Sequence, residues 1–145
     1  MSRRRPPSST EDLLSLLKSH GVKVTHQRLL VAEALMKLDH PTASEIYEFI
    51  ASRAPAVGVA TVYRTLRLFT KTGLTREISS MRGLSRYELY QRPHINLHCI
   101  ACGHITDFDD SHTKGLFSVF TRRGFRVLGC DVAVLCPSCT ARSRR

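Results

Sequence analysis

Apolar residues recur at helical spacing through the first half of the chain, in four segments separated by short polar turns. Three threonines precede these segments as capping residues, and Glu45 stands three positions after Thr42, as a capping box requires. Glycines follow the first and fourth segments, which is typical of helix ends. The expected helices cover residues 10–21, 25–38, 42–54 and 58–73.

Shorter segments that resemble strands follow the fourth helix. Leu74–Ser79 and Ser85–Tyr90 flank a turn at Gly83, and such a hairpin after three short helices predicts a winged helix-turn-helix. The fourth helix of the chain is then the recognition helix. The remaining pattern predicts a β-β-α-β unit with strands near Ile95–Ile100, His104–Phe108 and Phe125–Leu135 and a helix near Ser111–Arg123.

The fold class is therefore α+β, with an N-terminal winged-helix DNA-binding domain and a small second domain. A small sheet leaves edge strands open, so we expect the second domain to pair with another copy as a homodimer. The expected division is a flexible basic arm at 1–10, a winged-helix domain at 11–90, a hinge at 91–93, a dimerisation domain at 94–139 that contains all five cysteines and a basic tail at 140–145.

Four of the five cysteines form two Cys-x-x-Cys pairs, each on a predicted tight turn. Two such turns present four thiolates in a tetrahedron, which is the arrangement of a structural Zn²⁺ site. A redox dithiol protein or a pair of disulfides is the alternative, but nothing in the sequence indicates secretion. The expected zinc ligands are Cys99, Cys102, Cys136 and Cys139.

The chain is strongly basic, with a formal net charge of +10, and this bears on the kind of partner it binds. A basic N-terminal half suits nucleic acid, whose phosphates attract such charge, although a merely soluble basic surface is the alternative. The outward face of the fourth helix carries basic residues and, between Val57 and Lys71, no acidic one. The residues expected to contact double-stranded DNA are Thr25, Arg28, Thr61, Tyr63, Arg64, Arg67 and, at the wing tip, Arg82.

The sequence contains no apolar run of about 18 residues, which argues against a membrane span. The basic start MSRRRPPSST has no apolar stretch behind it, so we do not expect a secretory signal. Cysteines kept for metal indicate a reducing compartment, and the expected location is the cytoplasm.

Several of these stretches together resemble the ferric uptake regulator (Fur) superfamily. They are HPTASEIYEFI, VATVYRTLRLFTKTGL, RYELY, the H-x-N-x-x-C-x-x-C-G run and CPSC, and the resemblance extends from about Gly21 to Cys139. It implies a dimeric, metal-dependent transcription regulator, mostly a repressor, and not an enzyme. It also implies a four-cysteine structural zinc and base contacts from Tyr63 and Arg64.

The resemblance further implies a regulatory metal between the two domains. Its ligands map to His40, Glu88, His94, position 96 and Asp107. An ion joining these residues would fix the angle between the domains and favour the DNA-competent form. Mixed nitrogen and oxygen ligands suit Fe²⁺ or Mn²⁺, and Zn²⁺ is also possible. We therefore expect a repressor of metal-uptake or oxidative-stress genes.

Position 96 departs from the family, which usually has histidine where this chain has Asn96. Strand alternation places His94, Asn96 and His98 on one face, so His98 could substitute for the missing ligand. Alternatively the ion keeps fewer ligands and binds more weakly, or the sensory site is lost. Asp rather than Glu at 107 is a feature of the peroxide-sensing members, although the change at 96 weakens that inference.

Other interpretations stay open. Cys130 is either a small half-buried residue or an extra metal ligand or redox-sensitive thiol. The whole chain could be a zinc-stapled DNA-binding or protein-interaction module with a degenerate sensory site. A metal-dependent hydrolase using His94, His98 and Asp107 is a further alternative, although no nucleophile context supports it.

Overall fold

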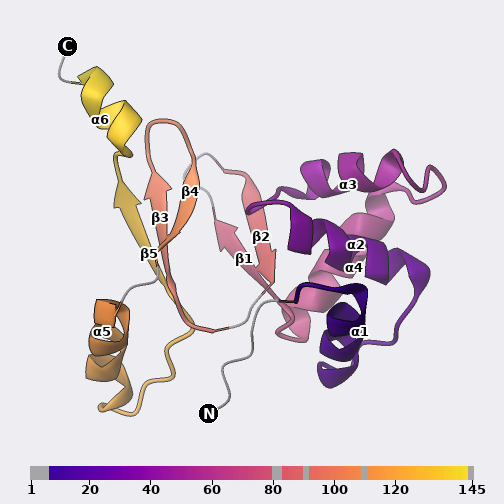
Figure 1. Cartoon of the computed structure of the whole chain (residues 1–145), viewed down its shortest axis with the longest axis horizontal. Coiled ribbons are helices and arrows are strands. Elements are labelled where there is room, and N and C mark those ends of the chain that lie inside the picture. The colour runs from indigo at the N-terminus through magenta and orange to yellow at the C-terminus, as the bar shows by residue number, and fades with distance from the viewer. Residues whose placement is uncertain (1–6, 80–82, 90–91, 109–110, 144–145) are drawn as a thin grey trace. The chain divides into compact units, whose positions relative to one another are not determined.

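The computed structural model describes residues 7–79, 83–89, 92–108 and 111–143. These residues form two compact units, which are considered one at a time. The N-terminal unit takes the first two ranges and the C-terminal unit takes the last two. In Figure 1 the chain runs from indigo through magenta in the first unit to orange and yellow in the second.

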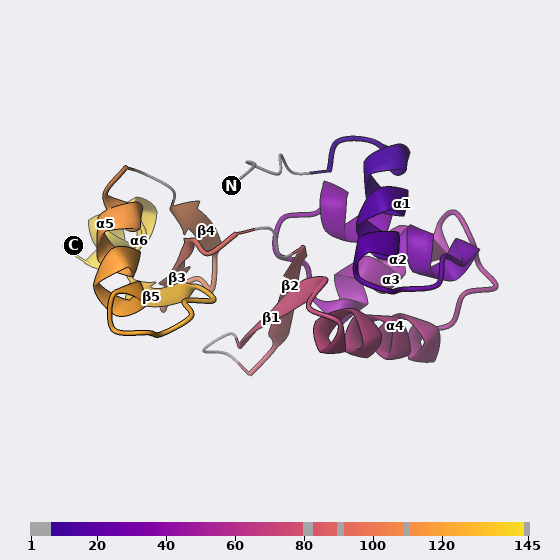
Figure 2. The same ribbon diagram turned by 90° about the horizontal axis from the view of Figure 1, so that it is seen from below.

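Four helices make up most of the N-terminal unit, as the apolar spacing predicts (Figure 2). Thr25 and Thr42 cap their helices as expected, and Glu45 completes the capping box. The first helix is capped by Ser9 rather than Thr10, because the Ser9 side chain accepts from the Asp12 backbone N–H while the Asp12 carboxylate accepts in return. The helices are α1 (Thr10–Ser19), α2 (His26–Lys37), α3 (Ala43–Ala51) and α4 (Val59–Lys71).

One hydrophobic core lies among these helices. Val62, Leu66 and Phe69 of α4 are fully buried in it, together with Ile46 and Ile50 of α3. Burying each such side chain contributes roughly 1.5–3 kcal/mol, so the apolar face of α4 is firmly fixed. The opposite face of α4 is thereby held toward solvent.

The hairpin of β1 (Thr75–Ser79) and β2 (Ser85–Leu89) completes the N-terminal unit. Its second strand is tied to the turn between α2 and α3, since the Tyr87 N–H donates to the Pro41 carbonyl over 2.9 Å. An isolated bridge between Thr42 and Arg86 adds to this connection. The turn that carries His40 is therefore fixed against β2.

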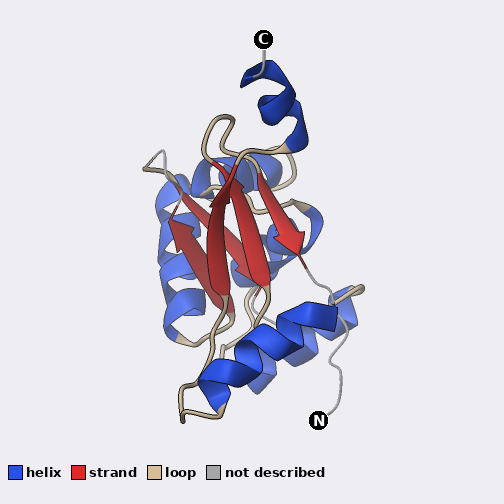
Figure 3. Cartoon of the chain, turned by 90° about the vertical axis from the view of Figure 1, so that its left-hand side faces the viewer, coloured by secondary structure: helices blue, strands red, loops and turns tan. Residues whose placement is uncertain are grey.

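The C-terminal unit is built on a three-stranded sheet with the order β4-β3-β5. Figure 3 draws the strands of both units in red. The central strand β3 pairs antiparallel with β4 and parallel with β5. This register aligns Asn96 with Asp107 on one side and with Asp131 on the other. The elements are β3 (Ile95–Cys99), β4 (Ile105–Phe108), α5 (Ser111–Thr121), β5 (Cys130–Val134) and α6 (Pro137–Ser143).

Two expectations for this unit need correction. The last strand begins at Cys130 rather than near Phe125, because its partner β3 is five residues long and offers pairing only over that length. The second cysteine pair is not a simple turn, since Pro137 opens the short helix α6 that contains Cys139. Residues 140–143, expected as part of a tail, belong to this helix.

Some expectations concern residues that the structure does not describe. These are Arg82 at the wing tip, Tyr90, Gln91 of the hinge, residues 1–6 of the arm and residues 144–145 of the tail. Among the described residues, no helix has the length and apolar character needed to cross a membrane.

Candidate metal centres and nucleic-acid interface

The four cysteines of the two Cys-x-x-Cys pairs come together at one end of the C-terminal sheet. Their sulfur atoms all lie within 4.8 Å of one another. A tight turn after β3 makes this possible, since the Gly103 N–H donates to the Cys99 carbonyl over 2.8 Å and Gly103 has a φ of 78°. All five cysteines are free thiols, so the disulfide alternative is not supported. Four sulfur donors at this spacing fit a tetrahedral Zn²⁺.

Hydrogen bonds shift the pKa values of two of these thiols in opposite directions. The backbone N–H of Cys136, which lies 3.4 Å from the Cys99 sulfur, together with the backbone of Cys102, lowers the pKa of Cys99 to about 5. Hydrogen bonds with the sulfurs of Cys136 and Cys99 raise the pKa of Cys139 to about 12. These hydrogen bonds thus favour the thiolate form at Cys99 and the protonated form at Cys139, and a bound Zn²⁺ would have to displace the Cys139 proton.

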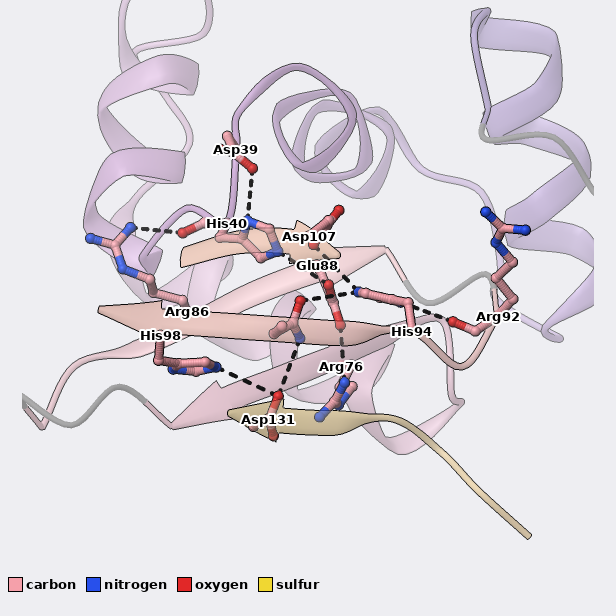
Figure 4. Close-up of polar contacts among 11 residues, drawn as sticks. Asp39, His40, Arg76, Arg86, Glu88, Arg92, His94, His98, Asp107 and Asp131 are labelled. Carbon is pink, nitrogen blue, oxygen red and sulfur yellow. Dashed lines mark hydrogen bonds and ion pairs between the residues drawn. The ribbon is translucent and has the colours of Figure 1, made fainter. Parts of the chain in front are cut away.

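In the N-terminal unit, His40 lies on the turn between α2 and α3 in a conformation unusual for a residue other than glycine. Its φ is 44°, and a hydrogen bond of 2.7 Å from the Arg86 side chain to its carbonyl stabilises the turn. The His40 Nδ1–H donates to Asp39 over 2.7 Å, which directs Nε2 toward Glu88 (Figure 4). An imidazole held in this way by a carboxylate is typical of a metal ligand.

Glu88 is buried on β2 and completes this half of the candidate site. Its Oε2 lies 3.3 Å from the His40 Nε2, and its Oε1 lies 3.5 Å from the Arg76 guanidinium. A buried carboxylate is stable only when positive charge compensates it. Arg76 supplies part of that charge and a cation beside His40 would supply more.

In the C-terminal unit, a second histidine and carboxylate lie close together. The His94 Nε2 is 3.5 Å from Asp107 Oδ1 on β4 and 3.1 Å from Asn96 Oδ1 on β3. The His94 Nδ1–H donates to the Arg92 carbonyl over 3.0 Å, which fixes the ring (Figure 4). Two oxygens and one nitrogen thus face one another, and such a donor set fits a divalent cation.

Asp131 of β5 is the residue that sequence reasoning missed. It accepts from the Asn96 Nδ2 over 3.2 Å, and the His98 Nε2 lies 3.5 Å from the same oxygen. His98 therefore contacts Asp131 rather than His94 or Asp107 in the part of the chain that the structure describes. The alternation of His94, Asn96 and His98 was visible in the sequence, but the pairing with Asp131 depends on the parallel register of β5.

α4 carries four of the residues that were expected to contact DNA, namely Thr61, Tyr63, Arg64 and Arg67. Thr61 and Arg64 line a surface hollow of about 270 Å³ together with Thr25 and Arg28 at the start of α2. Residues from two helices thus form one basic, hydroxyl-bearing surface. Such groups bind phosphates and base edges.

Tyr63 and Arg67 line a second hollow of about 410 Å³, bounded on the other side by Glu77 and Tyr87 of the hairpin. Burial raises the pKa of Tyr87, with the Glu77 charge adding to the effect, so its hydroxyl stays protonated at neutral pH. Tyr63 and Arg67 themselves are exposed. The hollow therefore adds a second polar surface beside α4.

Comparisons with known proteins agree with this geometry. The Ferric uptake regulator family matches residues 19–135. The chain belongs to this family. The Peroxide operon regulator of Bacillus subtilis (strain 168) is 37% identical over 110 residues, which cover 75% of this chain and 74% of that protein.

Solved structures of Fur-family proteins are also similar. The Campylobacter jejuni peroxide stress regulator has a TM-score of 0.69 at 31% identity and covers 88% of this chain and 98% of that chain. The Pseudomonas aeruginosa ferric uptake regulator with manganese has a TM-score of 0.74 at 26% identity and covers 86% and 97% respectively.

Membership of the Fur family makes the chain a metal-responsive, DNA-binding repressor. Regulators of this family are not enzymes, so the hydrolase alternative is wrong. The α+β fold, with a helical N-terminal domain and a small sheet domain that carries four cysteines, is confirmed.

Proposed function

We propose that the chain is a homodimeric repressor whose affinity for its operator is set by a divalent ion, Fe²⁺ or Mn²⁺, at the hinge between its two units. The four-cysteine group holds a structural Zn²⁺ that keeps the C-terminal unit folded. The proposed ligands of the regulatory ion are His40, Glu88, His94 and Asp107, with either Asn96 or His98 as a further ligand.

One observation carries this proposal: each unit contains its own closely spaced pair of a histidine and a carboxylate. The pairs are His40 with Glu88 at 3.3 Å and His94 with Asp107 at 3.5 Å. Each pair alone is a weak, two-ligand site. An ion that both pairs share binds one arrangement of the units better than the others, and it therefore shifts the population toward that arrangement.

Dimerisation is part of the proposal because the C-terminal unit leaves much apolar surface uncovered. Exposed side chains of this kind seldom gather on a monomer without a partner surface. A second copy also supplies the second recognition helix that an inverted-repeat operator requires. The exposed apolar residues are Ile100, Phe108, Leu116, Val119, Phe120, Phe125, Leu128, Val132 and Leu135.

The genes controlled belong in this proposal to metal uptake or the oxidative-stress response, and the protein acts in the cytoplasm. Relatives at about one third identity carry names that refer to peroxide. Asp107 and the two histidines of the pairs are the residues through which bound Fe²⁺ would report peroxide. A protein-interaction module without a working sensor is the competing proposal.

The deciding experiment measures metal per subunit before and after EDTA and after added Mn²⁺, in parallel with operator binding. We expect one chelation-resistant Zn²⁺ and one exchangeable ion, and we expect operator affinity to follow the exchangeable ion. Glu88→Gln should abolish this response while the resistant Zn²⁺ stays. Operator binding that is unchanged by Mn²⁺ would refute the hinge sensor.

DNA recognition is tested separately with Arg64→Ala in the metal-loaded protein. Loss of a base-contacting arginine costs about 1–3 kcal/mol of discrimination between operator and unrelated DNA. Arg53→Ala is the matched control, because Arg53 lies over the Phe49 ring and not on α4. Equal discrimination by both variants would exclude Arg64 from base readout and would favour the protein-interaction alternative if the affinity also lacked salt dependence.

A further inference from the structure

One of the core-facing residues of α4 carries a hydroxyl group. Val62, Leu66 and Phe69 are apolar and fully buried, whereas the fourth buried residue of the helix is Thr65, with 6% of its surface exposed. A buried hydroxyl that makes no hydrogen bond lowers stability, and a valine would fill the same space without that cost. The presence of threonine at this position therefore calls for a partner of its hydroxyl.

The Thr65 hydroxyl differs in this respect from that of Thr72 on the same helix end. The Thr72 hydroxyl lies 3.1 Å from the backbone carbonyl oxygens of both Leu68 and Phe69, so its hydrogen bond stays within the helix. Among the residues that the structure describes, the Thr65 hydroxyl has no hydrogen-bond partner. Its partner is then a group that binds from outside.

Thr65 lines the surface hollow of about 270 Å³ that α4 forms with the start of α2, so the small exposed part of this residue faces the hollow. We call this feature the α2–α4 hollow. Gln27 and Leu68 also line it, beside the threonines and arginines named above. A ligand in the hollow is therefore within reach of hydroxyl and amide donors from two helices.

Two guanidinium groups border the hollow, and backbone carbonyls hold both of them. The Arg28 Nη1–H donates to the Lys23 carbonyl over 2.8 Å, and the Arg64 Nε–H donates to the Ala60 carbonyl over 3.3 Å. A guanidinium has five N–H donors, so each group keeps others for a ligand. None of the described residues that line the hollow is acidic. The hollow therefore combines positive charge with hydrogen-bond donors.

This combination suits a ligand that accepts hydrogen bonds and carries negative charge. Base edges present donors as well as acceptors, whereas a phosphodiester presents acceptors only, with one negative charge. The hollow also lies at the start of α2, which is the positive end of the helix dipole. A phosphate of nucleic acid is thus the group that fits the hollow.

We propose that the α2–α4 hollow binds one phosphate of the DNA backbone in each half-site, and that the buried Thr65 hydroxyl donates a hydrogen bond to it. The inference rests on the proposed function, since α4 must lie against operator DNA. Phosphate contacts fix the register of a protein on DNA without reading the sequence. Thr65 thus seats α4 on the backbone, and Arg64 reads base edges from that position.

The first test compares Thr65→Val with wild type in the full-length, zinc-loaded protein with Mn²⁺. We expect affinity for operator and for mixed-sequence DNA to fall equally, by at least about tenfold, as loss of a hydrogen bond to a charged group does. Stability in urea should stay the same or rise, because valine removes a hydroxyl that has no partner in the free protein. A purely structural hydroxyl gives the opposite pattern, with lower stability and unchanged affinity.

Thr72→Val is the matched control, because the Thr72 hydroxyl is bonded within its helix and does not line the hollow. It should lose some stability and keep its affinity for DNA. Arg28→Gln should reduce the slope of log affinity against log salt by about one for each half-site, because it removes a charge beside the phosphate. Thr65→Val should leave that slope unchanged, because the hydroxyl is uncharged.

Modified DNA identifies the phosphate itself. Single linkages of the operator are replaced, one at a time, by neutral methylphosphonates. We expect one linkage in each half-site at which the replacement weakens wild-type binding at least about tenfold and weakens Thr65→Val binding several-fold less. At every other linkage the two proteins should respond equally.

Three outcomes overturn the inference. Wild-type affinity in Thr65→Val, or equal responses of both proteins at every linkage, would exclude Thr65 from phosphate binding. Loss of discrimination between operator and mixed-sequence DNA would make Thr65 a base-reading residue. Stabilisation of the DNA-free wild type by inorganic phosphate, absent in Thr65→Val and accompanied by unchanged DNA affinity, would assign the hollow to free phosphate. In each case wild-type protein still binds operator in response to Mn²⁺, whereas failure of the proposed function removes that response.

Discussion

Cys136→Ser should unfold the C-terminal unit while the N-terminal unit stays folded. The reason lies in how unevenly the two units bury apolar surface. The hydrophobic core of the described chain consists of residues of the N-terminal unit, from Leu13 to Tyr87. In the described part of the C-terminal unit, Ile95 and Ile105 are the buried aliphatic side chains.

Zinc binding contributes more to the stability of the C-terminal unit than its buried apolar side chains do. Two buried isoleucines contribute about 4 kcal/mol together, at roughly 1.5–3 kcal/mol each. A structural zinc site contributes apparent binding free energies on the order of 10–16 kcal/mol at neutral pH. Ser is a poor zinc ligand, so the substitution removes much of the free energy that zinc binding contributes. The contacts that remain within one C-terminal unit cannot offset the conformational entropy of ordering some fifty residues, so we expect the unit to unfold and the proposed dimer to separate with it.

The assay combines zinc content with amide hydrogen exchange of the two units. For Cys136→Ser we expect loss of Zn²⁺, loss of protection in β3 and β5, and wild-type protection in α2 and α4. Cys130→Ser is the matched control, because Cys130 lies outside the four-sulfur group and its removal should leave zinc in place. A zinc-loaded, fully protected Cys136→Ser protein would show that the cysteine clamp is wrongly assigned.

Two further substitutions test the N-terminal unit. Arg86→Ala removes the hydrogen bond to the strained His40 turn and the ion pair with Glu45, and it should lower the free energy of unfolding by about 2 kcal/mol and weaken regulatory metal binding. Urea unfolding checks this, and equal stability of Arg86→Ala and wild type would contradict the role of the bond. Ile46→Ala empties a fully buried position and should cost about 2–5 kcal/mol by the same measurement, whereas a loss below about 1 kcal/mol would show that α3 is loosely packed.

Much of this molecule could be predicted because its local patterns are strong. Helix caps such as Thr42 with Glu45 satisfy backbone groups within four residues, so their effect does not depend on distant parts of the chain. The two Cys-x-x-Cys pairs predicted a zinc site for a similar reason, because the two cysteines of each pair are only three positions apart and are brought together by local backbone structure. The predicted length of a strand was wrong where that length depends on the partner strand. The last strand was expected from Phe125, but it pairs with β3 only along the five residues of β3.

The sequence by itself determined the four helices, the hairpin, the cysteine clamp and the basic face of the α4 helix, because short-range periodicity and spacing encode all of them. Only the tertiary structure decided how the side chain of Asn96 is oriented. Its carbonyl faces His94 because a parallel strand from much later in the chain places Asp131 against its amide group. Strand register is a long-range property set by packing, so the residues around position 96 do not by themselves reveal this orientation.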